Sequence, residues 1–347
     1  MSQTLEKDRA GTSSPARRQT PQTARNLRAP ILLQIAAMIG IGALLYSSAA
    51  DWFSTLGHNA EVSGYVREVE QIPAEVREEM LQVGRDYNAH MPAGVLRDPY
   101  SNTALNDDLI DDAAYQSYLD VLRVSDHGVI GEVSYPRLGI SLPVYHGTSD
   151  EVLRKGAGHL FGSSLPVGGP STHSVMTSHS GLLNASLFTQ LPDAEIGDVF
   201  TVTVLGEKHF YEVRSTENVL PEQTESLRII DGEDWVTLIT CTPIGVNSHR
   251  LLVQAERIPP PAGEGERAIG GDGRTAGFPW WALIFLAGSG GTAALLFTPP
   301  KARLMQATNT GAAGATGVAG VTGAVSVTES TEVAEPTETT RVWEEKE

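Results

Sequence analysis

The sequence predicts a mainly β protein with a closed β-barrel of about eight strands, N-terminal helices, and one membrane-spanning helix on each side. Three observations lead to this prediction. Short β-branched and aromatic runs, separated by turn residues, follow one another through residues 128–258. Apolar runs flank the ordered region on both sides. A long stretch ahead of the strands has helical periodicity instead. Many short strands in so compact a region are typical of an antiparallel or mixed barrel.

The N-terminal part predicts a tail followed by a membrane anchor. Residues 1–29 are polar and rich in Lys and Arg, which indicates a disordered cytoplasmic tail. The run from Ile31 to Ala50 carries no formal charge, and about twenty helical residues cross a ~30 Å hydrocarbon core. A cleaved signal peptide is the alternative, and Ser48-Ala49-Ala50 fits it. The apolar run exceeds the usual length of a signal peptide core, so we expect an uncleaved anchor at residues 30–50.

A second span is expected at residues 278–298. Trp280 and Trp281 stand where an interfacial aromatic belt would place them, and Lys301 lies on the expected cytoplasmic side. Gly288 and Thr292 have a small-xxx-small spacing that can pack against the first span. A buried core helix is the alternative, but nothing globular follows. Residues 259–277 are a Pro/Gly-rich linker, and residues 299–347 predict a disordered acidic cytoplasmic tail.

The region 51–127 predicts two helices and a turn between them. The first helix covers Pro73 to Met91, with one face formed by Val76, Met80, Val83 and Tyr87. The second lies near residues 111–122. Between them, residues 96–101 form a turn, because Pro99 restrains Asp98 away from helical conformation.

The barrel region 128–258 contains seven recognisable strands. Each is a short run of β-branched or aromatic residues that ends at turn residues. The seven are 129–135, 141–145, 174–178, 200–204, 210–213, 236–241 and 251–255.

The last two of these strands carry the first candidate for chemistry. Cys241, the only cysteine, ends a buried-type strand, and a turn then leads into a returning strand that holds Arg250. This arrangement can place the thiol beside a fixed positive charge, an environment that lowers a thiol pKa from its usual ~8.5. The alternative is a small buried hydrophobe, since free cysteines are among the most buried residues. His249 neighbours Arg250, and adjacent strand residues point to opposite faces, so only one of the two faces the thiol.

The run Thr237-Leu238-Ile239-Thr240-Cys241, followed by Arg250, resembles the signature of sortases. Residues 142–148, 155–160 and 164–169 are similar to class C sortases, so the resemblance covers about residues 95–257. It implies a sortase-type β-barrel in which Cys241, His179 and Arg250 are catalytic. It also implies that Asp98-Pro99-Tyr100 is a lid over the cysteine. One departure stands at Ser180, where similar sequences commonly have Arg.

The function that this resemblance implies is acyl transfer without a cofactor. Cys241 would cleave an LPxTG-like sorting signal between Thr and Gly, His179 would protonate the leaving amine, and Arg250 would stabilise the oxyanion or hold the peptide. Class C members transfer the acyl group to a pilin Lys amine and so polymerise pilin. The expected setting is the plasma membrane of a Gram-positive bacterium, with both termini cytoplasmic and the catalytic domain outside.

Other functions remain open or are disfavoured. A sortase that anchors surface proteins to cell-wall peptide, a hydrolytic cysteine protease and a catalytically silent membrane scaffold are the alternatives. The formal net charge of −17 argues against nucleic-acid binding through phosphate contacts. A single cysteine cannot form an intramolecular disulfide, so the thiol stays free to react. Metal binding is not expected, because neither Cys241 nor the nine histidines show a recognised ligand spacing.

Overall fold

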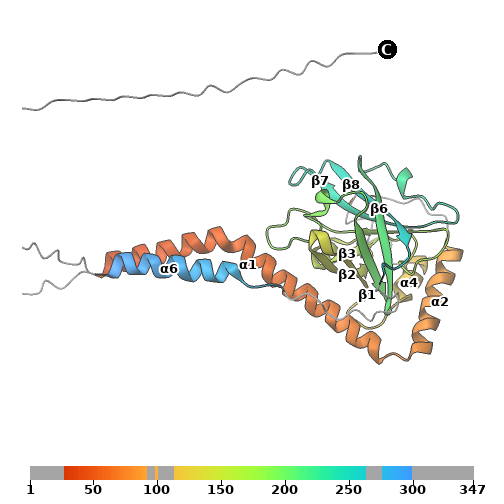
Figure 1. The fold of residues 1–347 in the computed structure, drawn as a ribbon, viewed down its shortest axis with the longest axis horizontal. Helices are drawn as coiled ribbons and strands as arrows, with labels where there is room; N and C mark the ends of the chain where they lie inside the picture. Colours follow the sequence, from red (N-terminus) through yellow and green to blue (C-terminus); the bar gives the residue numbers. More distant parts are fainter. Residues whose placement is uncertain (1–26, 92–97, 101–112, 263–275, 299–347) are drawn as a thin grey trace, which may run out of the picture. The chain divides into compact units, whose positions relative to one another are not determined.

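A computed structural model describes residues 27–91, 98–100, 113–262 and 276–298 of the protein. Outside this part of the chain lie residues 1–26 of the tail predicted at residues 1–29, the tail predicted at residues 299–347, and residues 263–275 of the linker. Within it, the elements follow one another as helices, barrel and a final helix (Figure 1).

Eight strands close into a barrel, as the sequence predicts. Their order around the barrel is β1-β2-β3-β4-β7-β8-β6-β5. The barrel is mixed, because β2 pairs with β3, and β4 with β7, in parallel, while the other neighbours are antiparallel. The strands are β1 Val129–Tyr135, β2 Ile140–His146, β3 Ala157–His159, β4 Thr172–Thr177, β5 Val199–Val204, β6 Glu207–Val219, β7 Asp234–Thr242 and β8 His249–Ile258. Short 3-10 helices interrupt the loops at η1 Pro136–Leu138, η2 Leu191–Asp193 and η3 Glu225–Leu227.

Two strands differ from the sequence prediction. β3 was not expected, because three residues centred on Gly158 carry too little β signal; it forms because β2 and β4 each pair with it. β6 runs for 13 residues, far beyond the expected 210–213. Its second half is mostly exposed and polar, so no apolar alternation marks it, yet it pairs with β8 as far as Val219 opposite Arg250.

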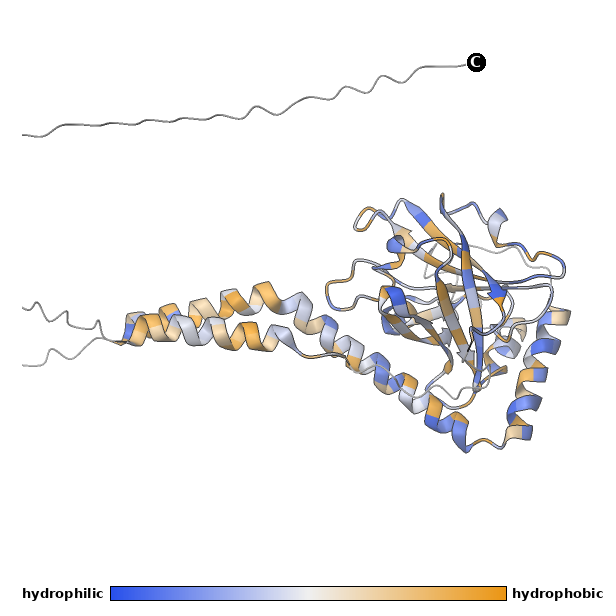
Figure 2. Ribbon diagram, in the orientation of Figure 1, coloured by the Kyte–Doolittle hydropathy of each residue, from blue (hydrophilic) through white to orange (hydrophobic). Residues whose placement is uncertain are grey.

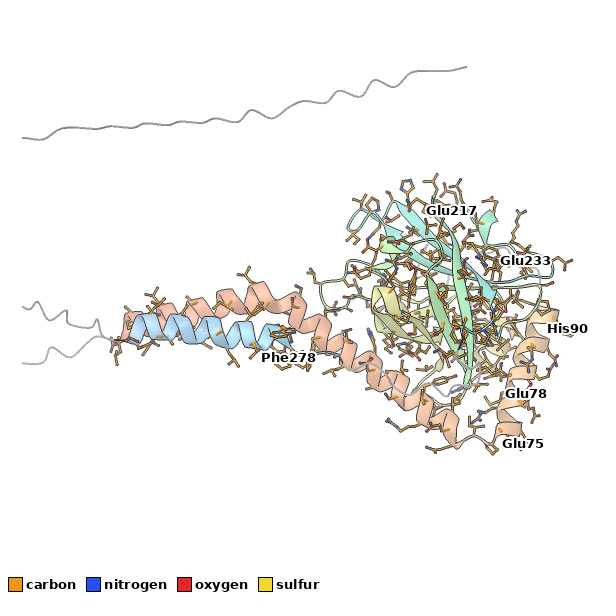
Figure 3. All side chains as sticks on the ribbon, viewed as in Figure 1. Glu75, Glu78, His90, Glu217, Glu233 and Phe278 are labelled. Atoms are coloured by element: carbon orange, nitrogen blue, oxygen red, sulfur yellow. The ribbon has the colours of Figure 1, made fainter. Side chains whose placement is uncertain are left out.

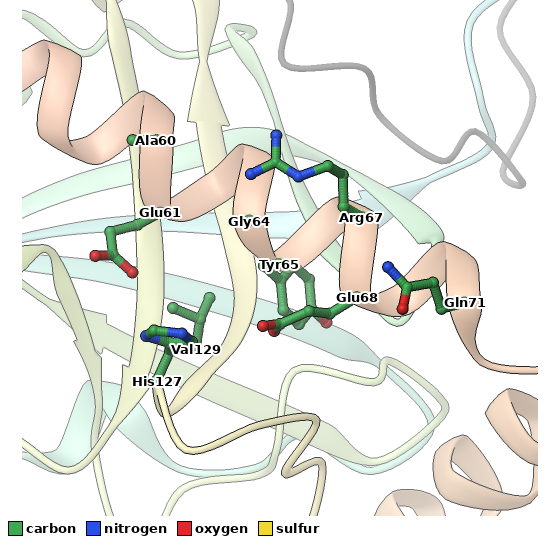
Figure 4. A pocket seen from close by; sticks show the side chains of 9 residues that line it. All are labelled: Ala60, Glu61, Gly64, Tyr65, Arg67, Glu68, Gln71, His127 and Val129. Carbon is green, nitrogen blue, oxygen red and sulfur yellow. The ribbon is translucent and has the colours of Figure 1, made fainter.

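Helix α1, Arg28–Gln71, continues the first apolar run without a break and ends on the barrel. Tyr65 and Val69, near its end, are almost fully buried in the barrel core. The Tyr65 hydroxyl donates a hydrogen bond to the Ile130 carbonyl (3.0 Å) and accepts one from the Leu205 amide (2.8 Å), which satisfies this buried polar group. A pocket of about 320 Å³ lies between α1 and the start of β1. Figure 4 shows Tyr65 among the side chains that line it. The second half of α1 is therefore part of the domain.

Three shorter helices surround the barrel: α2 Ala74–His90, α4 Ala113–Asp120 and α5 Asp150–Lys155. The predicted apolar face of α2 is wrong in part, because Val76 and Val83 are exposed. Leu81 and Gly84 are buried instead. A Cβ on Gly84 would lie 3.0 Å from Val167 Cγ1, so the glycine permits a close approach that a hydrophobicity pattern does not register.

Helix α6, Trp280–Phe297, packs along the first half of α1. Gly288 provides the contact, since Ile41 Cδ1 lies 3.1 Å from the position of a Cβ there, and Gln34 Nε2 donates to the Ser289 carbonyl (3.0 Å). Hydrophobic colouring fills α6 and the first half of α1, whereas α2 is largely hydrophilic (Figure 2). By length and composition, α1 and α6 can each cross a membrane.

Candidate active site

The hairpin of β7 and β8 brings the predicted thiol and guanidinium together. Cys241 and Arg250 are direct partners in the antiparallel register, and His249 stands opposite Thr242. Directly opposite residues in such a pair have Cβ atoms about 4.5–5.5 Å apart. Cys241 is 8% exposed and Arg250 9%. The pattern argument that only one of Arg250 and His249 accompanies the cysteine therefore agrees with the register.

His179 reaches the same end of the barrel from β4. Because β4 and β7 are parallel with Thr177 opposite Ile239, His179 and Cys241 each lie two residues beyond these partners. Ser180 fixes the connection, since its Oγ donates to the Cys241 carbonyl at 2.8 Å. Ser180, which stands where similar sequences commonly have Arg, thus links the loop after His179 to β7, the strand of Cys241.

The guanidinium of Arg250 is held from two sides. Its Nε and Nη2 donate to the two carboxylate oxygens of Asp98, both at 2.8 Å. Its Nη1 donates to the carbonyls of Asn247 (3.0 Å), in the β7–β8 turn, and of His249 (3.1 Å), the first residue of β8. Bidentate guanidinium–carboxylate contacts are among the stronger hydrogen-bonded pairs, and the Asp98 side chain here is only 4% exposed.

Tyr100 covers the site next to Asp98. Its hydroxyl donates to the Ser178 carbonyl and accepts from the Thr177 hydroxyl, both at 2.6 Å. The ring centroid lies 4.9 Å from the Arg250 guanidinium carbon and 5.9 Å from the His179 ring. Burial raises the pKa of Tyr100, so this hydroxyl stays protonated. Residues 96, 97 and 101 of the predicted turn lie outside the described residues.

The expected lowering of the Cys241 pKa is wrong for this arrangement. Burial raises the pKa of the thiol above its ordinary value, the nearby Asp98 carboxylate raises it further, and only the Arg250 charge lowers it. The sequence argument included the arginine but not the residues that cover it. With Asp98 in place, Cys241 therefore favours the thiol form.

Asp150 is a site residue that sequence reasoning missed. It is the first residue of α5, and its Oδ1 lies 3.2 Å from His179 Nε2. Its other oxygen accepts from Arg154 Nε at 2.7 Å. Asp150 and His179 are 29 positions apart and belong to different elements, so no local spacing signals the contact. Among the described residues, no group of three or more His, Cys, Asp and Glu side chains forms a metal site.

Comparison with known proteins shows the family to which the fold belongs. Residues 133–258 match the sortase domain family. Sortase C-1 from Actinomyces oris is 45% identical with a TM-score of 0.51, covering 53% of this chain and 99% of that one. Streptococcus pneumoniae sortase C is 39% identical with a TM-score of 0.51, covering 57% and 97%. Sortase A of Streptococcus agalactiae serotype III (strain NEM316) is 30% identical over 131 residues, or 37% of this chain.

A closed eight-stranded barrel with a cysteine–arginine pair at one end defines the class, and the chain belongs to the sortase family of cysteine transpeptidases. The solved structures of this fold similar to the chain include several class C sortases. The chain spans 52% of the length of the curated relative from S. agalactiae. A sortase domain between two apolar helices indicates membrane anchoring.

Proposed function

We propose that this protein is a membrane-anchored cysteine transpeptidase with Cys241 as nucleophile, His179 as proton donor and Arg250 as oriented hydrogen-bond donor. The observation that supports the proposal is that Cys241 pairs directly with Arg250, while β4 ends beside β7 and Ser180, next to His179, donates to the Cys241 carbonyl. A nucleophile, an acid and an oxyanion donor close to one another are what acyl transfer requires.

The reaction follows from these roles. The Cys241 thiolate attacks the carbonyl carbon of Thr in an LPxTG-like signal, and the carbonyl electrons move to oxygen. Collapse of this intermediate breaks the Thr–Gly bond, and His179 gives a proton to the departing Gly amine. The product is a thioester on Cys241. An acceptor amine then attacks the thioester, gives up its proton to the now neutral His179, and releases the sulfur as thiolate. One amide thus replaces another, both groups return to their starting state, and no cofactor takes part.

Arg250 is suited to hold the developing oxyanion or the peptide carbonyl. Its Nη1 is fixed to two backbone carbonyls, so the guanidinium keeps its position when Asp98 leaves. The Nε and Nη2 donors that Asp98 occupies then become free for substrate. Asp98, Pro99 and Tyr100 therefore act as a lid whose opening exposes the donors and removes a carboxylate that disfavours the thiolate.

The finer proposal is that the acceptor is a pilin Lys amine, so that the enzyme polymerises pilin subunits that carry the sorting signal. Its support is the lid geometry and the likeness to class C structures, one of which is described as informing pilin substrate specificity. The enzyme would sit in the plasma membrane of a Gram-positive bacterium with both termini cytoplasmic. Anchoring of surface proteins to cell-wall peptide is the second candidate, because the curated relatives carry the name Sortase A.

Trapping of a thioester tests the proposal. The full chain is mixed with a sorting-signal peptide, and intact-mass spectrometry should show an acyl adduct on Cys241. Cys241→Ala should abolish it, whereas His249→Ala, on the strand position beside Arg250, should form it normally. No adduct on folded wild-type protein, or turnover by Cys241→Ala, would contradict the assignment. Added amine should yield a transpeptide; free acid alone would indicate a protease.

The acceptor is tested by competition. With signal peptide held constant, a pilin domain and a cell-wall stem peptide are supplied together as amines. Preferential isopeptide bonds to pilin Lys support polymerisation. Preferential transfer to the stem peptide would replace it with the anchoring role.

A further inference from the structure

Three exposed apolar side chains border the candidate active site. Leu183 is 75% exposed, Val246 69% and Ile244 50%. Leu183 belongs to the loop that follows His179, and the other two belong to the β7–β8 turn that follows Cys241. Ile244 packs against Gly181 so closely that a Cβ on the glycine would overlap it. We name Leu183, Ile244 and Val246 the apolar rim. Single exposed apolar residues are common, but three on adjoining loops are typical of a surface that binds a partner or a membrane.

The loop that carries Leu183 is tied to α1 at the end of the membrane span. The backbone amide of Ser186 donates to Asp51 Oδ1 at 2.6 Å. Asp51 directly follows the apolar run that ends at Ala50. Three residues of extended chain reach roughly 11 Å at most, so Leu183 lies within that distance of Ser186. Leu183 is thus close to the level at which α1 leaves its apolar run, and Ile244, which packs against Gly181, contacts the same loop.

Aromatic residues mark the same level as a membrane interface. The Trp52 ring lies 5.1 Å from Phe53 and 6.2 Å from Trp281, and its Nε1 donates to the Gly277 carbonyl at 3.1 Å. Trp residues collect at the boundary between hydrocarbon and headgroups. Because α1 continues unbroken into the barrel core at Tyr65, the barrel keeps a fixed height above this boundary.

We propose that the apolar rim rests in the headgroup layer of the bilayer that α1 and α6 span, so that the Cys241 end of the barrel faces the membrane surface. The argument for lipid as the occupant is continuity. Asp51 joins the loop to the helix that enters the bilayer, and the aromatic residues that mark the interface are its direct neighbours. Apolar side chains beside an aromatic belt favour the interface over water.

The single cysteine of the chain makes a direct test practical. In a Cys241→Ala background, Leu183→Cys provides one thiol for an environment-sensitive fluorophore. The full chain is reconstituted in phosphatidylcholine vesicles that carry a nitroxide on the headgroup, with outward orientation checked by protease. The matched control is Ile230→Cys, which is 45% exposed and precedes β7 at the end away from Cys241. Glu233, close to it in sequence, lies on the side of the barrel away from Phe278 (Figure 3).

The expected result is several-fold stronger quenching of the Leu183 label than of the Ile230 label, with a blue-shifted emission. Val246→Cys repeats the measurement on the other loop and covers a labelling defect at Leu183. Equal quenching of rim and control labels in folded protein would overturn the proposal. So would emission that changes only when a sorting-signal peptide is added, which would make the rim a substrate surface. A signal that depends on protein density and not on nitroxide would indicate a second copy and would also overturn it.

Discussion

Two carboxylate–guanidinium pairs lie at opposite ends of the β7–β8 hairpin, and they differ in where the carboxylate comes from. At the cysteine end, Asp98 belongs to a segment outside the barrel and binds Arg250 through two 2.8 Å contacts. At the other end, Asp234 is part of β7 and lies 3.5 Å from Arg257.

The second carboxylate is shared among several barrel elements. Besides Arg257, it accepts hydrogen bonds from the Gly169 amide (2.9 Å) and the Tyr211 hydroxyl (3.1 Å). Burial nevertheless raises the Asp234 pKa above its ordinary value. The Asp234 pair therefore joins parts of the barrel that cannot separate without unfolding, whereas we propose that the Asp98 pair opens as a lid.

Asp234→Ala should have the largest effect and should act on stability. We expect the free energy of unfolding to fall by about 3 kcal/mol, the low end for breaking a buried pair, because Arg257 is 22% exposed and keeps some water. Guanidinium titration followed by tryptophan fluorescence measures it. Asp98→Ala is the control. Its free energy of unfolding should fall clearly less, because water reaches Arg250 once the lid has opened. Equal losses would remove the distinction between the pairs.

Arg250→Lys should slow thioester formation by about 10²-fold or more while the protein stays folded. An ammonium keeps the charge but cannot maintain the fork of donors that the Nη1 contacts to Asn247 and His249 hold in place. Single-turnover rates at saturating peptide measure it. The expected loss is ~10²-fold. If the variant instead kept more than about a tenth of the wild-type rate, Arg250 would act through its charge alone and not as an oriented donor.

Asp98→Ala combined with Tyr100→Ala should increase the alkylation rate of Cys241. A lid that favours closure by ~1.4 kcal/mol hides about nine-tenths of the molecules, so the rate should rise about tenfold. Burial and Asp98 both raise the Cys241 pKa, so their removal lowers it and should also shift the rate–pH curve toward lower pH. Asp126→Ala, a surface residue paired with Arg123, is the control. Unchanged rates in the folded double variant would exclude a lid.

Per pH unit, the smallest effect should come from a buried histidine at the structural end. Burial, with the charges of Arg257 and Arg85, lowers the His209 pKa to about 3. The unfolded chain binds this proton near pH 6.5, so stability is full above that pH and falls between pH 6.5 and about 3. The loss is up to about 1.4 kcal/mol per pH unit. In a plot of the free energy of unfolding against pH, His209→Leu should lower the slope below pH 6.5 by the contribution of one proton. An unchanged slope would contradict the burial argument.

The sequence predicted the features that depend on near neighbours. β1 has the expected bounds, and Cys241 opposite Arg250 follows from a single hairpin in which strand periodicity decides which residues meet. His179 was found through family resemblance, and the parallel register of β4 and β7 then explains its position. Whether His179, Cys241 and Arg250 act as proposed remains a prediction.

The missed features depend on partners remote in the chain. β3 exists because its two neighbours pair with it, and the buried face of α2 depends on Val167 across a glycine. The Cys241 pKa is raised mainly by burial and to a smaller extent by Asp98, which reaches Arg250 across 152 positions. The local sequence pattern does not show how deeply Cys241 is buried. The direction of its pKa shift could therefore be read only from the structure.

The continuous course of α1 has a kinetic consequence. From Asp51 to Gln71 the helix continues for roughly 30 Å beyond the apolar run, at 1.5 Å per residue. Its C-terminal end is packed in the barrel core, so the helix and the barrel are joined without a flexible linker. In a membrane that α1 spans, the domain travels with its anchor in two dimensions. Encounters with a partner held in the same bilayer are governed by molecules per unit area and by lateral diffusion, and dilution of the surrounding medium leaves their frequency unchanged.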